Sequence, residues 1–192
     1  MNKCVIFFVE GSTDLEFYKE LVKYIRNKSM TGKLQHKIIY RNVKGIGGYK
    51  KEVNRIFTKE ILPKIQGDEI TVVLCYDTDV FGYVQKPRIN WKEIEGMLIN
   101  DGANQVIHVK AEKSIEDWFL IDIDGVCDFL KIDKQSSVSG KNGYEKLKQL
   151  FRKGNKIYNK GVEVKGFIQA LDIGSICEKI SKQINVLFKL LL

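Results

Sequence analysis

Apolar runs and helical repeats alternate along the first two thirds of the chain. Residues 4–9 form a continuous apolar run that ends at Glu10 and Gly11, and such runs are typical of parallel strands covered on both faces. Comparable strand patterns occur at about 37–43, 70–76 and 105–109. Apolar residues at helical spacing predict helices over about 14–27, 49–65, 91–100 and 115–121. Strands that alternate with helices predict an α/β domain with about four parallel strands and right-handed crossovers.

The pattern changes after Asp124, where only helical spacing remains. Helices are expected at about 126–130, 144–151 and 175–192, and residues 154–165 predict an irregular or hairpin connection. We therefore expect an α/β core over 1–122 and a mainly helical extension over 123–192 that packs on this core.

Composition adds a basic charge to a normal globular balance. The 192 residues carry a net charge of +8, which favours a polyanionic partner such as nucleic acid, although simple solubility explains it about equally well. The four cysteines are far apart and do not form a metal-binding pattern, so a reducing cytoplasm is expected. The N-terminal apolar run is too short for a signal peptide, and no run of 18 apolar residues predicts a membrane span.

Carboxylates follow two of the predicted strands. Glu10 comes directly after the first strand, and Asp77 and Asp79 end the third. Ligands of open parallel sheets bind beyond the carboxyl ends of the strands, and Mg²⁺ prefers such carboxylate oxygens. An Asp-x-Asp pair at a strand end is by itself more often a turn or a helix cap. Its combination with Glu10 on a second buried strand favours a site for Mg²⁺ or Mn²⁺.

Two segments resemble the signature of the Toprim family. Residues 8–14 read FVEGSTD and residues 72–79 read VVLCYDTD, and the resemblance covers roughly residues 3–121. The form of the first segment is most similar to small stand-alone Toprim proteins and to the overcoming-lysogenization-defect nucleases. The resemblance implies a Toprim/Rossmann-like fold and metal-dependent work on phosphodiester bonds.

The resemblance also implies roles for single residues. Glu10 matches the family glutamate, a general acid/base or a metal ligand, while Asp77 and Asp79 match the paired metal-binding aspartates. Asp14 matches an acidic residue that joins the metal cluster in the nuclease branch, or it is a first-turn carboxylate favoured by the helix dipole. Residues 111–120 resemble the segment after strand four of that branch, in which Glu116 is the first choice for a further metal ligand.

Other residues near this segment are weaker candidates. Asp117 is the second choice for that ligand, and Glu112 is close in sequence. Lys113 can contact a scissile phosphate, or it is simply solvated. Asp122 and Asp124 repeat the Asp-x-Asp pattern after a helix, which favours a capping role.

A glycine loop before the second predicted helix is a candidate phosphate site. Backbone N–H groups at a helix N-terminus attract anions, and glycines allow close approach of a phosphate. The loop is not a Walker A motif, and a plain strand-to-helix turn explains it about equally well. The candidate contacts are Lys44, Gly45, Gly47, Gly48 and Lys50.

These expectations combine into a Mg²⁺-dependent or Mn²⁺-dependent nuclease of Toprim type that acts on DNA or RNA. The family resemblance further implies a role in phage defence or nucleic-acid processing and a separate ATPase as partner. The alternative is a non-catalytic module that binds metal or nucleic acid and partners that ATPase. A phosphoacceptor domain is a weaker third reading, because such domains usually carry aspartates after the first strand.

Overall fold

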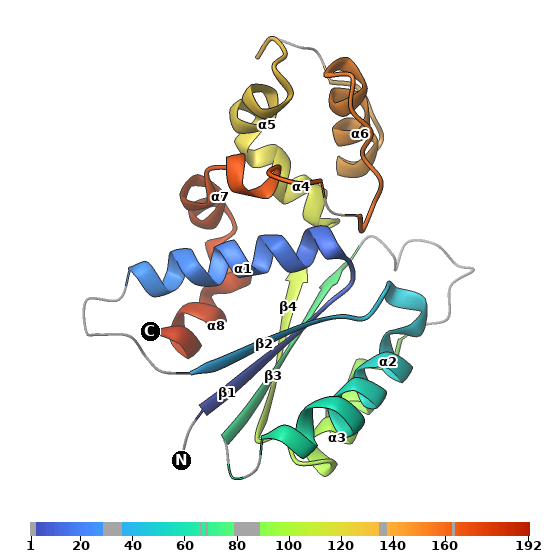
Figure 1. The fold of residues 1–192 in the computed structure, drawn as a ribbon, viewed down its shortest axis with the longest axis vertical. Coiled ribbons are helices and arrows are strands. Elements are labelled where there is room, and N and C mark those ends of the chain that lie inside the picture. Colours follow the sequence, from blue (N-terminus) through green and yellow to red (C-terminus); the bar gives the residue numbers. More distant parts are fainter. Residues whose placement is uncertain are drawn as a thin grey trace.

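The computed structural model describes residues 3–28, 36–65, 67, 69–78, 89–134, 138–162 and 164–192. Its centre is a four-stranded sheet in the order β2-β1-β3-β4, and all three strand pairs are parallel. The strands are β1 (Lys3–Val9), β2 (Lys37–Asn42), β3 (Glu69–Asp77) and β4 (Gln105–Ala111). This Rossmann-like arrangement confirms the α/β fold expected from the alternating pattern (Figure 1).

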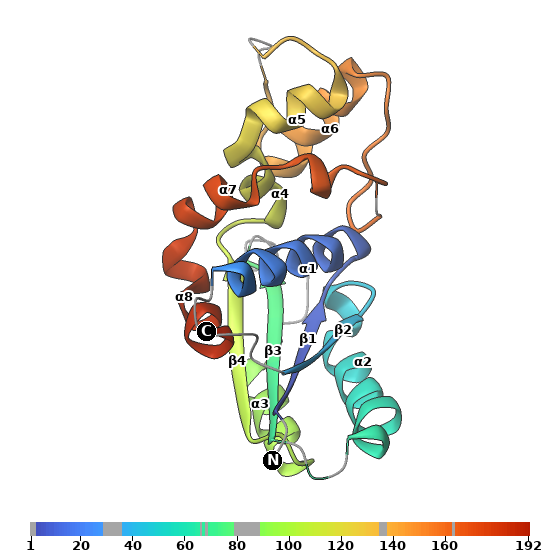
Figure 2. The same ribbon diagram turned by 60° about the vertical axis from the view of Figure 1, so that its left-hand side comes forward.

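The two faces of the sheet bury different side chains because successive strand residues point to opposite sides. Val5, Phe7 and Val9 of β1 enter one buried cluster, whereas Cys4, Ile6 and Phe8 enter the other. The second cluster lies under α2 (Tyr49–Ile56) and α3 (Trp91–Asn100). The first cluster lies under α1 (Ser12–Asn27) and the helices that follow β4 (Figures 1 and 2).

The helices after β4 share the buried cluster of α1 and the strands. Leu147, Phe167 and Leu187 belong to the same cluster as Phe7, so this region packs on the sheet, while the boundary at residue 122 stays a prediction. Figure 1 shows α4, α5 and α6 beyond the carboxyl end of the sheet. The helices are α4 (Ile115–Phe119), α5 (Ile123–Leu130), α6 (Gly143–Lys153), α7 (Ile173–Lys179) and α8 (Ser181–Leu191), with short 3₁₀ turns η5 (Leu120–Asp122) and η6 (Ile168–Ala170).

Two of the expected helices are divided. The segment 49–65, which follows the short 3₁₀ turn η1 (Ile46–Gly48), starts with α2 and continues as a π-helical stretch, η2 (Phe57–Ile61), and the 3₁₀ turn η3 (Leu62–Lys64). The segment 175–192 is two helices because Ile180, with φ −96° and ψ 14°, leaves the helical path. With this break, α7 contacts α1, and α8 contacts both α1 and β4. The sequence does not indicate this break, because the apolar stripe continues across both helices.

The cysteines and the hydropathy of the helices agree with the sequence. All four cysteines are buried free thiols, as expected for Cys4 and Cys75. Within the described ranges, no helix combines the length and apolar character needed to cross a membrane.

Candidate active site

Glu10 and Asp77 meet at the carboxyl edge of the sheet. β1 and β3 are neighbouring parallel strands, so the residues at their carboxyl ends lie side by side. The backbone N–H of Asp77 donates a hydrogen bond to Glu10 Oε1 at 3.0 Å. The two acidic residues expected to converge from distant parts of the sequence are therefore in direct contact.

Asp14 joins them from the first turn of α1. Its Oδ2 accepts a hydrogen bond from the Gly11 N–H at 3.0 Å, which satisfies one of the N–H groups left without a partner at the start of a helix. The helix begins at Ser12, two residues earlier than the spacing indicated. Asp14 thus has the structural role of a first-turn carboxylate and also lies within electrostatic reach of Glu10 and Glu116.

Glu116 is the most deeply buried carboxylate of the group. It lies in α4 with 1% of its surface exposed, and its Oε1 accepts a hydrogen bond from the Tyr158 hydroxyl at 3.1 Å. Its Oε2 is buried without a hydrogen-bond partner among the residues that the structure describes. A buried carboxylate oxygen without a hydrogen-bond partner destabilises the folded state, and a nearby positive charge reduces this effect.

Lys160 supplies a positive charge that the sequence did not indicate. Its Nζ lies 2.8 Å from Asp77 Oδ2 and 4.0 Å from Glu116 Oε2. Lys160 and Asp77 are 83 residues apart in the sequence. Nothing in the local pattern of residues 154–165 distinguishes Lys160 from the other lysines of this basic chain, so only the tertiary structure identifies it.

The segment that carries Lys160 docks on the start of α1. The Ser12 N–H donates to the carbonyl of Gly161 at 2.9 Å, and the Thr13 hydroxyl donates to the carbonyl of Val162 at 2.8 Å. A Cβ atom on Gly11 would lie 2.5 Å from the Cα of Gly161, so only glycine fits at position 11. The glycine after Glu10 therefore has a packing reason: it lets the Lys160 segment reach the carboxylates.

Burial and mutual repulsion raise the pKa of two carboxyls in this group. Burial raises the pKa of Asp14 to about 7, with further increases from the charges of Glu116 and Glu10. Burial likewise raises the pKa of Asp77 to about 8, although the ammonium of Lys160 acts in the opposite direction. Burial and Glu116 also raise the pKa of the Tyr158 hydroxyl well above its ordinary value, so it remains a neutral hydrogen-bond donor. These directions are those expected where like charges converge in a site of low dielectric.

The chemistry of these side chains fits a hard divalent cation, although their present geometry does not coordinate one. Among the described residues, no group of three or more His, Cys, Asp or Glu side chains is arranged to hold a metal ion. Asp77 instead uses Oδ1 to accept from the Ile115 N–H at 2.9 Å and Oδ2 to pair with Lys160. The buried Oε2 of Glu116 and the raised pKa of Asp14 nevertheless indicate excess negative charge of the kind that Mg²⁺ neutralises.

The other candidates from the segment after β4 have hydrogen-bond partners outside this group. Lys113 is exposed, with its backbone N–H bonded to Thr78 Oγ1 at 2.9 Å. Asp117 accepts from the Ser114 hydroxyl at 2.9 Å, and exposed Glu112 lies 3.5 Å from Gln183 Nε2. Asp122 caps α5 through the Gly125 N–H, as its pattern indicated. Asp79 lies outside the described residues.

The glycine loop joins the same edge of the sheet. The Gly45 N–H donates to the backbone carbonyl of Glu10 at 2.8 Å, and Lys44 adopts a positive φ of 58° beside it. Gly47 and Gly48 are exposed, whereas the Lys50 ammonium pairs with Glu93 of α3. The loop is thus a strand-to-helix turn next to the carboxylates, and its phosphate-binding role stays a prediction.

Comparison of the chain with models of protein families, with curated proteins and with solved structures finds no match.

Proposed function

We propose that the chain catalyses Mg²⁺-dependent or Mn²⁺-dependent cleavage of phosphodiester bonds in nucleic acid. The observation that carries the proposal is the convergence of Glu10, Asp14, Asp77 and Glu116 at the carboxyl edge of a parallel sheet, with the Lys160 ammonium beside Asp77 and Glu116. Ligands of this sheet type bind at that edge, and perturbed carboxyl pKa values concentrate at functional sites. The resemblance to the Toprim signature supports the same reaction class.

In this proposal Asp77 and Glu116 are the primary ligands of the cation, with Glu10 and Asp14 beside them. A bound divalent cation neutralises the phosphate charge and lowers the pKa of a water molecule. Asp79 is a further ligand on the strength of the sequence resemblance alone. Glu10 is the candidate general acid/base because it is half-buried next to Asp77 and matches the glutamate of the Toprim signature.

Lys160 has a second role in the proposal. If Asp77 held a metal ion, the Lys160 ammonium that now pairs with it would be able to contact a phosphate oxygen instead. Lys113, exposed on the same edge, is the other candidate for such a contact. The four free buried cysteines fit the cytoplasmic setting expected for this function.

The test is a cleavage assay with labelled single-stranded and double-stranded DNA and RNA in the presence of Mg²⁺ or Mn²⁺. Asp77→Asn and Glu10→Gln each remove a charge with little change of shape, and we expect each to lower the cleavage rate at least about a hundredfold. Asp101→Asn is the matched control, because Asp101 is an exposed carboxylate that follows α3 and precedes β4, at the opposite end of the strands from the group. Cleavage that survives both variants, or that does not require a divalent cation, contradicts the proposal.

The second candidate function is a non-catalytic module that binds nucleic acid and works with a separate ATPase. The ion pair between Lys160 and Asp77 favours it, because an internal ammonium already neutralises part of the acidic group. The same assay separates the two functions. Nucleic acid that is bound without cleavage, with Mg²⁺ and Mn²⁺ present, supports the module.

A further inference from the structure

A second feature of the surface is a shallow, open groove along the outer side of α2. It has a volume of about 600 Å³ and is lined by Gly47, Gly48, Lys50, Lys51, Asn54, Arg55, Thr58 and Lys59. All of its charged lining residues are basic and exposed. A concave surface lined only by cations and neutral polar groups is suited to a polyanionic ligand.

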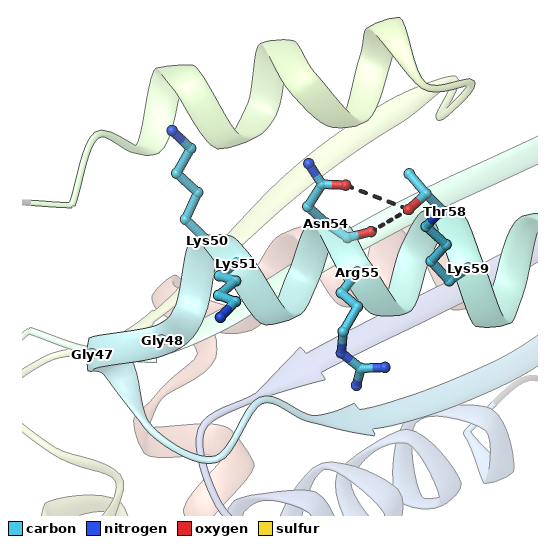
Figure 3. Close-up of a pocket in the computed structure, with 8 residues that line it drawn as sticks. All are labelled: Gly47, Gly48, Lys50, Lys51, Asn54, Arg55, Thr58 and Lys59. Carbon is cyan, nitrogen blue, oxygen red and sulfur yellow. Dashed lines mark hydrogen bonds between the residues drawn. The ribbon is translucent and has the colours of Figure 1, made fainter.

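The lining side chains form two rows along the helix. Lys50, Asn54 and Thr58 repeat every four residues, and Lys51, Arg55 and Lys59 repeat in the same way beside them. Residues four apart on a helix lie on one face, about 6 Å apart along the axis. Figure 3 shows Lys50 directed towards α3, whereas Lys51 and Arg55 extend on the side of β2. A row of cations with this regular spacing matches a chain of phosphates better than a single phosphate group.

The charges of the groove differ in how far they are already neutralised. Arg55 pairs with Glu52 and Glu60, and Lys50 pairs with Glu93. In the described part of the chain, neither Lys51 nor Lys59 takes part in an ion pair. These two exposed ammonium groups are therefore the ones whose counterions a phosphate backbone would release.

The groove is held against the carboxyl edge of the sheet at its glycine end. The Tyr49 hydroxyl, at the start of α2, donates to the carbonyls of Phe8 and Cys75 at 3.1 Å each. The Gly45 N–H donates to the carbonyl of Glu10. A strand that lies along α2 and leaves the groove at Gly47 and Gly48 therefore arrives beside Glu10.

From these observations we infer that the groove on α2 binds the sugar–phosphate backbone of one nucleic-acid strand and directs that strand to the carboxylates. The inference rests on the proposed function for the class of ligand. It adds Lys51, Arg55 and Lys59 to the phosphate contacts that the glycine loop indicated. We expect binding at the groove to be electrostatic and independent of base sequence, because contacts between cations and phosphates carry no sequence information.

The test is a binding titration of fluorescent oligonucleotides in EDTA, in which metal-dependent cleavage cannot occur, at a series of salt concentrations. The groove variant is Lys51→Gln combined with Lys59→Gln. The control is Lys179→Gln combined with Lys182→Gln, two exposed lysines of α7 and α8 at the other face of the sheet, also without an ion pair in the described residues. Both double variants lower the net charge equally.

We expect the groove variant to bind about fivefold more weakly, or worse, at low salt, and the control to bind like the wild type. The slope of log K against log salt falls by about 1.4 for a single strand or about 1.8 for a duplex, because two phosphate contacts are lost. Single-stranded and double-stranded probes therefore identify which form occupies the groove. Circular dichroism and thermal unfolding check that the variants are folded.

Three outcomes overturn the inference. The two double variants have equal affinities and equal salt slopes, or the wild type does not bind nucleic acid. The third is that polyglutamate binds as tightly as nucleic acid and is weakened equally by the groove variant, which indicates a general polyanion site. The cleavage assay decides the proposed function separately. If the groove variant binds weakly and the wild type cleaves no nucleic acid, the groove inference is supported and the nuclease proposal is contradicted. If the groove variant binds normally and the wild type shows metal-dependent cleavage, the nuclease proposal is supported and the groove inference is contradicted.

Discussion

Lys160 explains how several carboxylates can lie together in a folded protein. Asp77 is 4% exposed and Glu116 is 1% exposed, and two such charges close together repel each other strongly. The Lys160 ammonium is within ion-pair distance of both. The remaining imbalance appears in the raised pKa values of Asp14 and Asp77. The residues that would bind a cation are thus the residues that destabilise the fold in its absence.

These raised pKa values predict how stability depends on pH. Between about pH 4 and pH 8, Asp14 and Asp77 hold more protons in the folded state than in the unfolded state. The free energy of unfolding therefore decreases as pH rises through this range, by at most about 1.4 kcal/mol per pH unit for each group. Asp14→Asn or Asp77→Asn removes one such contribution, so the decrease becomes shallower.

Urea unfolding at a series of pH values, without added metal, measures this effect. Asp101→Asn is the control, because Asp101 follows α3 on the exposed surface away from the acidic group. Its pH dependence should match that of the wild type. A wild-type stability that rises steadily from pH 4 to pH 8 would show that the two carboxyls ionise normally.

At the scale of elements, the site depends on how the turn between β1 and α1 fits the segment around Gly161. Two hydrogen bonds and a close contact between Gly11 and Gly161 join them. Overpacked contacts of this kind force the backbone apart and typically cost 1–3 kcal/mol. Gly11→Ala should therefore lower the free energy of unfolding by about that amount and move Lys160 away from Asp77.

Gly96→Ala is the matched control for that substitution. Gly96 is exposed in the interior of α3, and a Cβ atom there meets open space. Alanine is the better helix former by about 0.5–1 kcal/mol, so this variant should gain stability. Chemical denaturation measures both variants, and a Gly11→Ala protein as stable as the wild type would refute the close contact.

The elements also show what the sequence can and cannot indicate. Parallel strands end at one edge, so apolar runs that end in Glu10 and Asp77 were enough to predict their contact. Lys160 comes from an irregular segment far along the chain, and no local periodicity relates it to Asp77. The break at Ile180 was likewise missed, because an apolar stripe reports burial but not whether two helices share it. Contacts between segments that are far apart in the sequence are therefore not predicted by local hydrophobic periodicity.

At the scale of the whole molecule, the sheet separates two buried clusters, and the two proposed sites are built from different elements around it. The carboxylate group forms only where β1, β3, α1, α4 and the segment around Lys160 meet, so it needs both the strands and the region after β4. The basic groove lies on the other side, on α2. The two are connected through the Gly45 contact to Glu10. This arrangement is the basis for the proposed path of a nucleic-acid strand from the basic groove to the carboxylate group.

The central claim is that the carboxylates at this edge bind a divalent cation, and crystals soaked in Mn²⁺ test it most directly. The anomalous signal of Mn²⁺ locates the ion without reference to activity. We predict a peak within about 2.5 Å of carboxylate oxygens of Asp77 and Glu116, with Lys160 displaced from Asp77. Crystals in which these side chains are ordered and open to solvent, the Lys160–Asp77 ion pair is intact and no peak lies beside them would contradict the account.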